Sequence, residues 1–598
     1  MKFSVLRSSW LVILAGVLFS LYLLWQVPDG VYFSGDGGLK ALLAQQLSTG
    51  TIRFDLIQPL NNWVQNLWSQ GLYPYEEPFV YHLENRYFIT FPFPFSLVTA
   101  PFYAFFGYRG LYFVPLVATW IIWVVFYLMC QRLNFSPFNT FLALTILVFS
   151  SNLTLYSAMY WEHTLAVALC FVGLAILFIS RNISDISINS LVLSGCAIGL
   201  SAWVRSEFLA MVGTSAFLAF LIAIFRNRLQ KKKDYLNQFF LVNSKIVVFL
   251  ASLFSTVILF FIANKLIYNH FLGIHALQIV DNFSWSQRLT EAWESFREIS
   301  ISFFDYFPVA LFALLYLLLF LLNKLTNRFN SRFLVFGLVL ITFLSGIYLI
   351  LAGGIVGLKS FVKQWGILLL LASTWLFLLR KVKVKLNTKM TFIYLICLLF
   401  TIGVALLVDS GADEIAVGGK QWGPRYLLIL IPLVALLAVE ELSLLRKSSN
   451  FASNLSLLVF GALLVIGFHK NLYEGTAFFQ QAHQGVAPAI QELQKNSNSV
   501  IVVSHQYVTQ LLEPSIRGEK FFFRAEDPES LLKLSTVLVD QNQSSFIYVC
   551  YPHRPCDLPQ ENSNRFSFSN QNQDFEIRFH DLGKLGKYPT YEATIVPL

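Results

Sequence analysis

Long apolar runs recur along most of the chain and constrain its fold more than any other feature. Counting runs of roughly 17 to 22 residues, the length of a membrane-crossing helix, gives about thirteen candidate spans. Their approximate limits are 9–27, 111–130, 138–157, 164–180, 189–204, 208–225, 245–267, 307–322, 333–351, 365–380, 391–408, 426–443 and 452–468. Because 56% of the residues are hydrophobic and only 13% are charged, we predict an α-helical polytopic membrane protein.

The basic residues between these runs predict the orientation of the chain. They form short clusters at Arg132, Arg181, 226–233, Lys324 with Arg328 and Arg332, 380–389, and Arg446 with Lys447. If the N-terminus is cytoplasmic and 11–25 is a retained signal anchor, all of these clusters lie on the cytoplasmic side. The net charge of +9 therefore reflects membrane topology, and we predict no nucleic-acid partner.

Four segments fall on the opposite, outer side. They are residues 28–110, 158–163, 268–306 and 409–425. In the first, 39–47 has helical spacing, and the proline-broken apolar stretch 91–107 is expected to lie along the membrane interface. Its aromatic residues are expected to anchor at the interface or stack on a sugar ring, and they are Trp63, Trp68, Tyr73, Tyr75 and Tyr81.

The composition becomes polar after Phe468, which divides the chain into a transmembrane domain over 1–470 and a soluble domain over 471–598. Strand-like runs at 499–504, 536–539 and 546–550, with a helical stretch at 527–534, predict a small α/β domain on the outer face. Cys550 and Cys556 bracket a short polar loop, for which a disulfide is favoured over a metal site and free thiols remain an alternative.

Asp36 lies just beyond the first span, in Ser-Gly-Asp-Gly-Gly-Leu-Lys. Taken alone, it is a good N-cap for an interfacial helix beginning at Gly37. The topology brings other polar residues to the same face, namely Glu162, His163, Arg205, Glu207, Lys420, Trp422 and Arg425. Since charges beside apolar spans are costly unless paired or hydrated, the group predicts a polar cavity. Carboxylates there suit proton abstraction or metal binding, and Arg and Lys suit a phosphate.

The order of these motifs resembles the GT-C superfamily of membrane glycosyltransferases. The similar features are the acid after the first span at Asp36, the interfacial stretch 91–107, the second acid Glu162, the Gly-x-x-x-Gly-Leu pattern leading to Arg205, and Gly-Pro-Arg-Tyr at 423–426. The resemblance covers roughly residues 1–470. This chain has a single Asp in the first motif and Glu as the second acid, so both a metal-free site and a divalent metal on Asp36 and Glu162 remain open.

The resemblance implies a reaction. A sugar would move from a polyprenyl-phosphate donor to a hydroxyl of a protein, lipid or glycan by an inverting displacement at the outer face of a bacterial plasma membrane. Asp36 would be the general base, with Glu162 as a second catalytic acid, and Arg205, Lys420 and Arg425 would neutralise the lipid phosphate. His163, Glu207 and Trp422 are further site candidates.

Two other classes compete with this interpretation. A lipid-linked saccharide flippase or transporter predicts charges through the middle of several spans and paired repeats, whereas the acids here gather at one face. A polysaccharide polymerase or ligase shares the lipid-linked substrate and has less reason for a charged motif directly after the first span.

Overall fold

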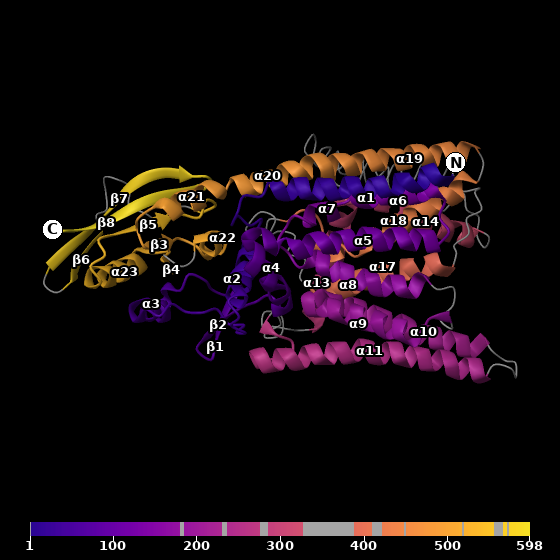
Figure 1. Ribbon diagram of the computed structural model, residues 1–598, viewed down its shortest axis with the longest axis horizontal. Coiled ribbons are helices and arrows are strands. Elements are labelled where there is room, and N and C mark those ends of the chain that lie inside the picture. Colours follow the sequence, from indigo (N-terminus) through magenta and orange to yellow (C-terminus); the bar gives the residue numbers. More distant parts are fainter. Residues whose placement is uncertain are drawn as a thin grey trace.

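The structure is a computed structural model of the 598-residue chain. It describes residues 2–179, 185–229, 236–274, 285–326, 388–408, 421–447, 450–516, 520–554, 556, 566–570 and 573–598. A bundle of long helices forms one end of an elongated molecule and a β-sheet domain forms the other (Figure 1). The first outer loop lies between them, so any site at the outer edge of the bundle is bordered by all three parts.

The bundle is built from apolar helices. They are α1 (Lys2–Trp25), α5 (Phe113–Arg132), α6 (Pro137–Phe149), α7 (Leu153–Tyr156), α8 (His163–Ile179), α9 (Ile188–Val204), α10 (Leu209–Leu229), α11 (Leu236–Tyr268), α14 (Val309–Thr326), α17 (Thr388–Leu407), α18 (Leu430–Arg446) and α19 (Asn450–Phe468). Eleven of the thirteen predicted spans overlap one of these helices, and 333–351 and 365–380 lie outside the described residues.

The count of full-length spans is smaller. Among the described residues, six helices are long and apolar enough to cross a membrane, and α6, α8 and α9 are shorter apolar helices. The amphipathic stretch predicted near Trp285 is helix α13 (Trp285–Tyr306), which meets α14 at an angle of 116°. The chain is therefore a helical integral membrane protein, and the exact number thirteen is not confirmed.

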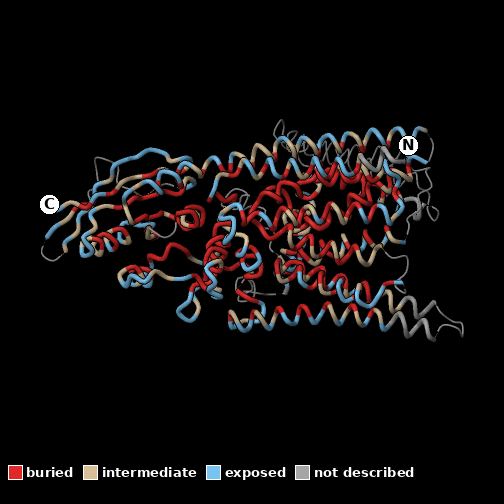
Figure 2. Tube along the Cα trace, viewed as in Figure 1, coloured by how far each residue is buried: buried red, intermediate tan, exposed pale blue. Residues whose placement is uncertain are grey.

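Burial follows the expected pattern of a helix bundle. Red, buried segments fill the middle of the bundle in Figure 2, whereas α11 and the outer sides of α1 and α19 carry many exposed residues. Exposed side chains on these helices include Leu14, Leu18, Ile258, Leu259 and Leu458. Apolar side chains on an outer helical surface are what a lipid environment stabilises.

The first outer loop folds into a separate layer. It contains α2 (Gly35–Ser48), α3 (Asn62–Leu67), η1 (Trp68–Leu72), the hairpin β1 (Val80–Leu83) and β2 (Arg86–Ile89), and α4 (Phe93–Leu111). The predicted helix at 39–47 is confirmed as α2, and the proline-rich stretch forms α4, with Pro94 in its first turn. Gly107 at φ 58° breaks α4 near its end, a left-handed conformation that glycine adopts readily.

The C-terminal part is an α/β domain. Helices α20 (Gly475–Gln484), α21 (Ala487–Lys495), α22 (Gln506–Ile516) and α23 (Pro528–Asp540) accompany strands β3 (Val500–Val503), β4 (Phe521–Arg524), β5 (Ser545–Val549), β6 (Phe566–Asn570), β7 (Gln573–Leu585) and β8 (Tyr588–Pro597). The sheet order is β4-β3-β5-β8-β7-β6. β3 is parallel to β4 and β5, and the other neighbours are antiparallel. The Cys550–Cys556 disulfide is formed.

One strand prediction in this domain is wrong. Residues 536–539 belong to α23, which Asp527 caps by accepting a hydrogen bond from the Ser530 N–H. The Val-Leu-Val run looked like a strand, but the buried residues Leu531, Leu534 and Leu538 repeat with helical spacing. The long antiparallel strands β7 and β8 had not been predicted, because their sequences mix polar and apolar residues.

The outer loop and the C-terminal domain are packed together. Trp68 Nε1 donates to the backbone oxygen of Phe522 at 3.1 Å, and Trp63 stacks on Phe523. Trp68, Tyr73, Tyr75 and Tyr81 are buried in this junction. Stacking on a sugar ring is therefore wrong for these four residues, since protein side chains cover them. Trp63 is only partly buried, and anchoring at the membrane interface stays a prediction.

Candidate functional site

Asp36 lies in the first turn of α2 and is not its N-cap. The helix begins at Gly35, two residues earlier than expected, so Ser34 takes the cap position in an extended conformation without a side-chain capping bond. The Ser34 hydroxyl instead accepts a hydrogen bond from Trp161 Nε1 at 2.8 Å. The capping interpretation is thus wrong by position, and the Asp36 carboxylate is left to interact with groups outside its own helix.

Arg425 is the partner of Asp36. Its Nη1 lies 3.4 Å from Asp36 Oδ2, and both side chains are 20% exposed. The guanidinium also donates from Nη2 to the Tyr426 hydroxyl at 3.0 Å and lies over the Trp161 ring at 5.8 Å. The short 3₁₀ helix η7 (Arg425–Leu427), just before α18, therefore brings the arginine of the Gly-Pro-Arg-Tyr motif to the start of α2.

Glu162 is enclosed by two cations. Its Oε1 accepts from Arg205 Nη1 at 2.7 Å, its Oε2 accepts from Lys40 Nζ, and Arg205 Nε donates to Glu207 Oε1 at 2.7 Å. Lys40 and Glu162 are 1% exposed, Arg205 is 11% exposed and Glu207 is 3% exposed. Burial alone would raise the pKa of the Glu162 carboxyl, but Lys40 and Arg205 hold this pKa well below its usual value.

Lys40 is a site residue that the sequence reasoning missed. It stands four residues after Asp36, so both side chains lie on the same face of α2. Its ammonium also lies 4.2 Å from the centre of the Phe91 ring. The i, i+4 spacing of an acid and a base at the start of the predicted helix was the signal that could have identified it.

The remaining predicted residues take different positions. His163 is buried beside Tyr156 and Trp161, and neither ring nitrogen has a hydrogen-bond partner among the described residues. Trp422 is a packing residue, since its ring meets Tyr306 and Phe478 while its Nε1 donates to Asn471 at 3.3 Å. Lys420 lies outside the described residues.

The site therefore contains two ionic groups of different character. The Lys40–Glu162–Arg205–Glu207 network is buried and fully paired, which suits a structural role. The Asp36–Arg425 pair is longer and more exposed, so a ligand can reach it and separate it more easily. An arriving phosphate would compete with Asp36 for Arg425.

The surroundings of the two acids do not fit a metal site. The nearest charged partners of Asp36 and Glu162 are Arg425, Lys40 and Arg205, whereas a metal ion requires several ligand groups of the acidic or imidazole type. These two residues are therefore unsuited to hold a metal ion together. A group with metal-ligand geometry occurs elsewhere, at Glu76, His505 and Glu526.

The helix bundle, the folded layer after the first span and the C-terminal sheet domain confirm the fold expected from the motifs, and a solved structure shares this fold. No protein-family model and no curated protein matches the chain. Among solved structures, the chain is similar to ArnT from Cupriavidus metallidurans bound to undecaprenyl phosphate, with a TM-score of 0.51 at 11% identity over 97% of both chains. The same protein in the apo state gives a TM-score of 0.48 at 12% identity, again over 97% of both chains.

Proposed function

We propose that this protein is a glycosyltransferase that moves a sugar from a polyprenyl-phosphate donor to a hydroxyl acceptor. The reaction takes place at the outer face of a bacterial plasma membrane, with the N-terminus cytoplasmic and the C-terminal domain periplasmic or extracellular. The acceptor hydroxyl belongs to a protein, a lipid or a glycan. A single displacement inverts the configuration at the anomeric carbon.

The Asp36–Arg425 pair is the observation that carries this proposal. A carboxylate and a guanidinium 3.4 Å apart, each 20% exposed, supply the two groups that the reaction needs. The guanidinium binds the phosphate that leaves with the lipid, and the carboxylate accepts the proton of the attacking hydroxyl. Binding of the donor phosphate to Arg425 releases Asp36, so the base becomes available when the donor is present.

Glu162 acts as a positioning residue in this mechanism. Both of its oxygens accept hydrogen bonds from cations, so it has no free oxygen for an acceptor proton. Glu162 fixes Arg205, whose guanidinium lies 5.6 Å from the Tyr426 ring. Arg425 contacts the hydroxyl of the same tyrosine. Arg205 and Lys420 add positive charge for the lipid phosphate. Glu207 belongs to the same network through its pair with Arg205, and His163 borders it.

The lipid-linked donor is supported by the similarity to ArnT, which was crystallised with undecaprenyl phosphate. A donor held in the membrane also explains why the charged groups stand at the outer ends of apolar helices rather than in a soluble domain. In such a site, with little water, each contact to the phosphate is stronger than in solution.

The proposal is tested by comparing cells that produce the wild-type protein with cells that produce equal amounts of Asp36→Asn. Mass spectrometry of their glycans, lipids and secreted proteins should find an added sugar mass only with the wild-type protein. Identical profiles, with the wild-type protein correctly folded in the membrane, would contradict the assignment.

A further inference from the structure

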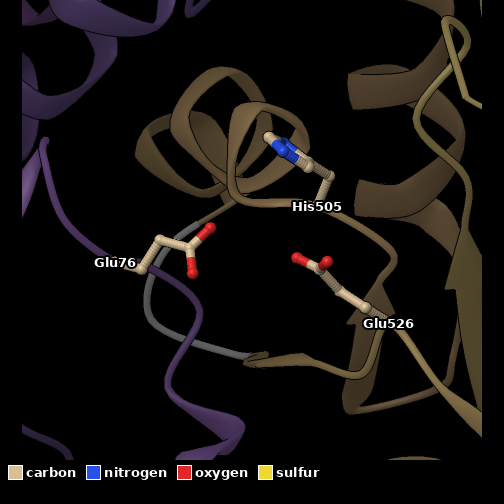
Figure 3. A group of neighbouring side chains, drawn as sticks. All are labelled: Glu76, His505 and Glu526. Carbon is tan, nitrogen blue, oxygen red and sulfur yellow. The ribbon is translucent and has the colours of Figure 1, made fainter.

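Three potential metal ligands meet where the first outer loop touches the C-terminal domain. Glu76 comes from the loop between η1 and β1, His505 follows β3 and Glu526 follows β4. One ligand atom from each lies within 4.8 Å of the other two, and Figure 3 shows both carboxylates and the imidazole facing a common space. Two distant parts of the sequence therefore contribute to one group.

The topology of the sheet explains this meeting. β3 and β4 are parallel neighbours, and Val503 pairs with Arg524 at the end of their register. His505 and Glu526 each stand two residues beyond these positions, so they leave the sheet at the same edge. The carboxyl edge of parallel strands is where α/β domains commonly bind ligands.

The side chains in this group are held in place by their neighbours. Glu76 Oε1 accepts from Gln506 Nε2 at 3.2 Å, and the Glu76 N–H donates to Gln506 Oε1, also at 3.2 Å. The His505 ring stacks on Tyr551, with 4.9 Å between ring centres. Such contacts fix the direction of metal ligands and are a regular part of metal sites.

A hydrogen bond also orients the His505 ring. Its Nδ1 accepts from the Tyr507 N–H at 3.2 Å. In a neutral imidazole whose Nδ1 accepts, the proton lies on Nε2, so a metal ion on this ring would replace either that proton or the bond from Tyr507.

Arg524 is the cation that pairs with the two carboxylates of this group. Its guanidinium pairs with Glu76 Oε2 and lies 3.7 Å from Glu526 Oε1. The two carboxylates therefore attract a cation in the protein as it stands. A divalent ion carries twice the charge and would compete with Arg524 for both of them.

We propose that Glu76, His505 and Glu526 form a binding site for a divalent transition-metal ion of the Zn²⁺ type. One nitrogen and two carboxylate ligands suit Zn²⁺, which commonly takes three protein ligands and a water molecule. Mg²⁺ and Ca²⁺ prefer more ligands, all of them oxygen. The ion links the first outer loop to the C-terminal domain.

Helix α22 connects the proposed metal site to α2, the helix that carries Asp36. Helix α22 begins at Gln506, directly after His505, and Gln510 on α22 packs against Gly35 and Gly38 of α2. Gln45 Nε2 on α2 donates to the backbone oxygen of Pro514 at 2.8 Å. An ion on His505 therefore stabilises the α22–α2 contact. Metal binding itself does not depend on the proposed sugar transfer.

Calorimetric titration of the full-length, tag-free protein in lipid nanodiscs with Zn²⁺ tests the proposal. The wild-type protein should bind one ion, and His505→Ala and Glu526→Gln should each weaken binding at least tenfold, roughly the loss that follows damage to a metal site. His580→Ala and Glu492→Gln are matched controls on the same domain, both exposed and outside the group, and should bind as the wild type does.

Arg524→Gln keeps all three ligands and removes the competing cation, so it should bind Zn²⁺ severalfold more tightly than the wild type. This variant keeps the test decisive if His505→Ala fails to fold. A wild-type protein that binds no Zn²⁺, His505→Ala with wild-type affinity, Arg524→Gln with unchanged affinity, or a site that prefers Mg²⁺ would each overturn the proposal.

Discussion

Replacing Glu162 by glutamine should destabilise the protein strongly, because it leaves two buried cations without their shared anion. In the wild type, the positive charges of Lys40 and Arg205 are balanced by Glu162 and Glu207, and the Lys40–Glu162 contact is 1% exposed on both sides. Glu162→Gln changes the net charge of this network from zero to +1. Removing one partner of a buried ion pair costs about 3–5 kcal/mol.

A second substitution tests the physical reason. Lys40→Met combined with Glu162→Gln restores a net charge of zero, since Arg205 keeps Glu207 at 2.7 Å. The double variant should therefore be more stable than Glu162→Gln alone, and should recover about half or more of the loss. If Glu162→Gln lowers the stability strongly and the double variant does not recover any of it, damage to packing is the cause rather than an unpaired charge.

Thermal or denaturant unfolding of purified protein in nanodiscs measures both variants. Glu492→Gln is the matched control, because its pair with Lys495 at 3.3 Å is exposed on both sides and should contribute only about 0–1 kcal/mol. If Glu162→Gln costs no more than Glu492→Gln, the charges of the Lys40–Glu162–Arg205–Glu207 network are not essential to the fold, and the reasoning is refuted.

Three other predictions concern the same region. The difference in unfolding free energy between the wild type and Glu162→Gln should be largest above pH 4.5, the ordinary pKa of a glutamate, and should become smaller as the pH falls below 4.5. The reason is that a lowered pKa in the folded state makes the charged carboxylate the stabilising form. A difference that does not change with pH would contradict this prediction. Gly38→Ala should lower the stability by about 1–3 kcal/mol and reduce activity, because the new Cβ meets the backbone oxygen of Gln510. In the control Gly213→Ala the new Cβ has nothing within 4 Å, so this variant should be as stable as the wild type or more stable. Equal effects of the two substitutions would exclude tight α2–α22 packing as the cause. Arg425→Gln should weaken binding of undecaprenyl phosphate about tenfold or more, while Arg446→Gln should bind normally; equal affinities would remove Arg425 from the phosphate site.

Much of the membrane fold could be predicted because its physical cause is local. Runs such as 111–130 and 245–267 are long enough and apolar enough to require a helix in lipid. The stretch 91–107 is helical, with Pro94 in the first turn of α4 and Pro101 inside the helix, and its position along the membrane interface stays a prediction. Local composition carried this information without any knowledge of tertiary contacts.

The site could be predicted only in part, because pairing depends on contacts between distant residues. Topology indicated that Asp36, Glu162, Arg205 and Arg425 share one face, and the structure brings them together as two ionic groups. The predicted topology gave no information on which acid pairs with which base, and the sequence analysis missed Lys40. The aromatic residues of the outer loop show the same limit, since only the C-terminal domain explains why Trp68 is buried.

The most direct test of the proposed reaction is the fate of the donor in reconstituted vesicles. Wild-type protein supplied with lipid-linked sugars and the matching cell-envelope acceptors should release free polyprenyl phosphate in step with sugar appearing on an acceptor. Asp36→Asn should lower this rate by about 10²–10⁴-fold at equal amounts of folded protein. If the wild-type protein moves the lipid-linked sugar across the membrane and leaves it intact, or if Asp36→Asn turns over normally, the account is contradicted.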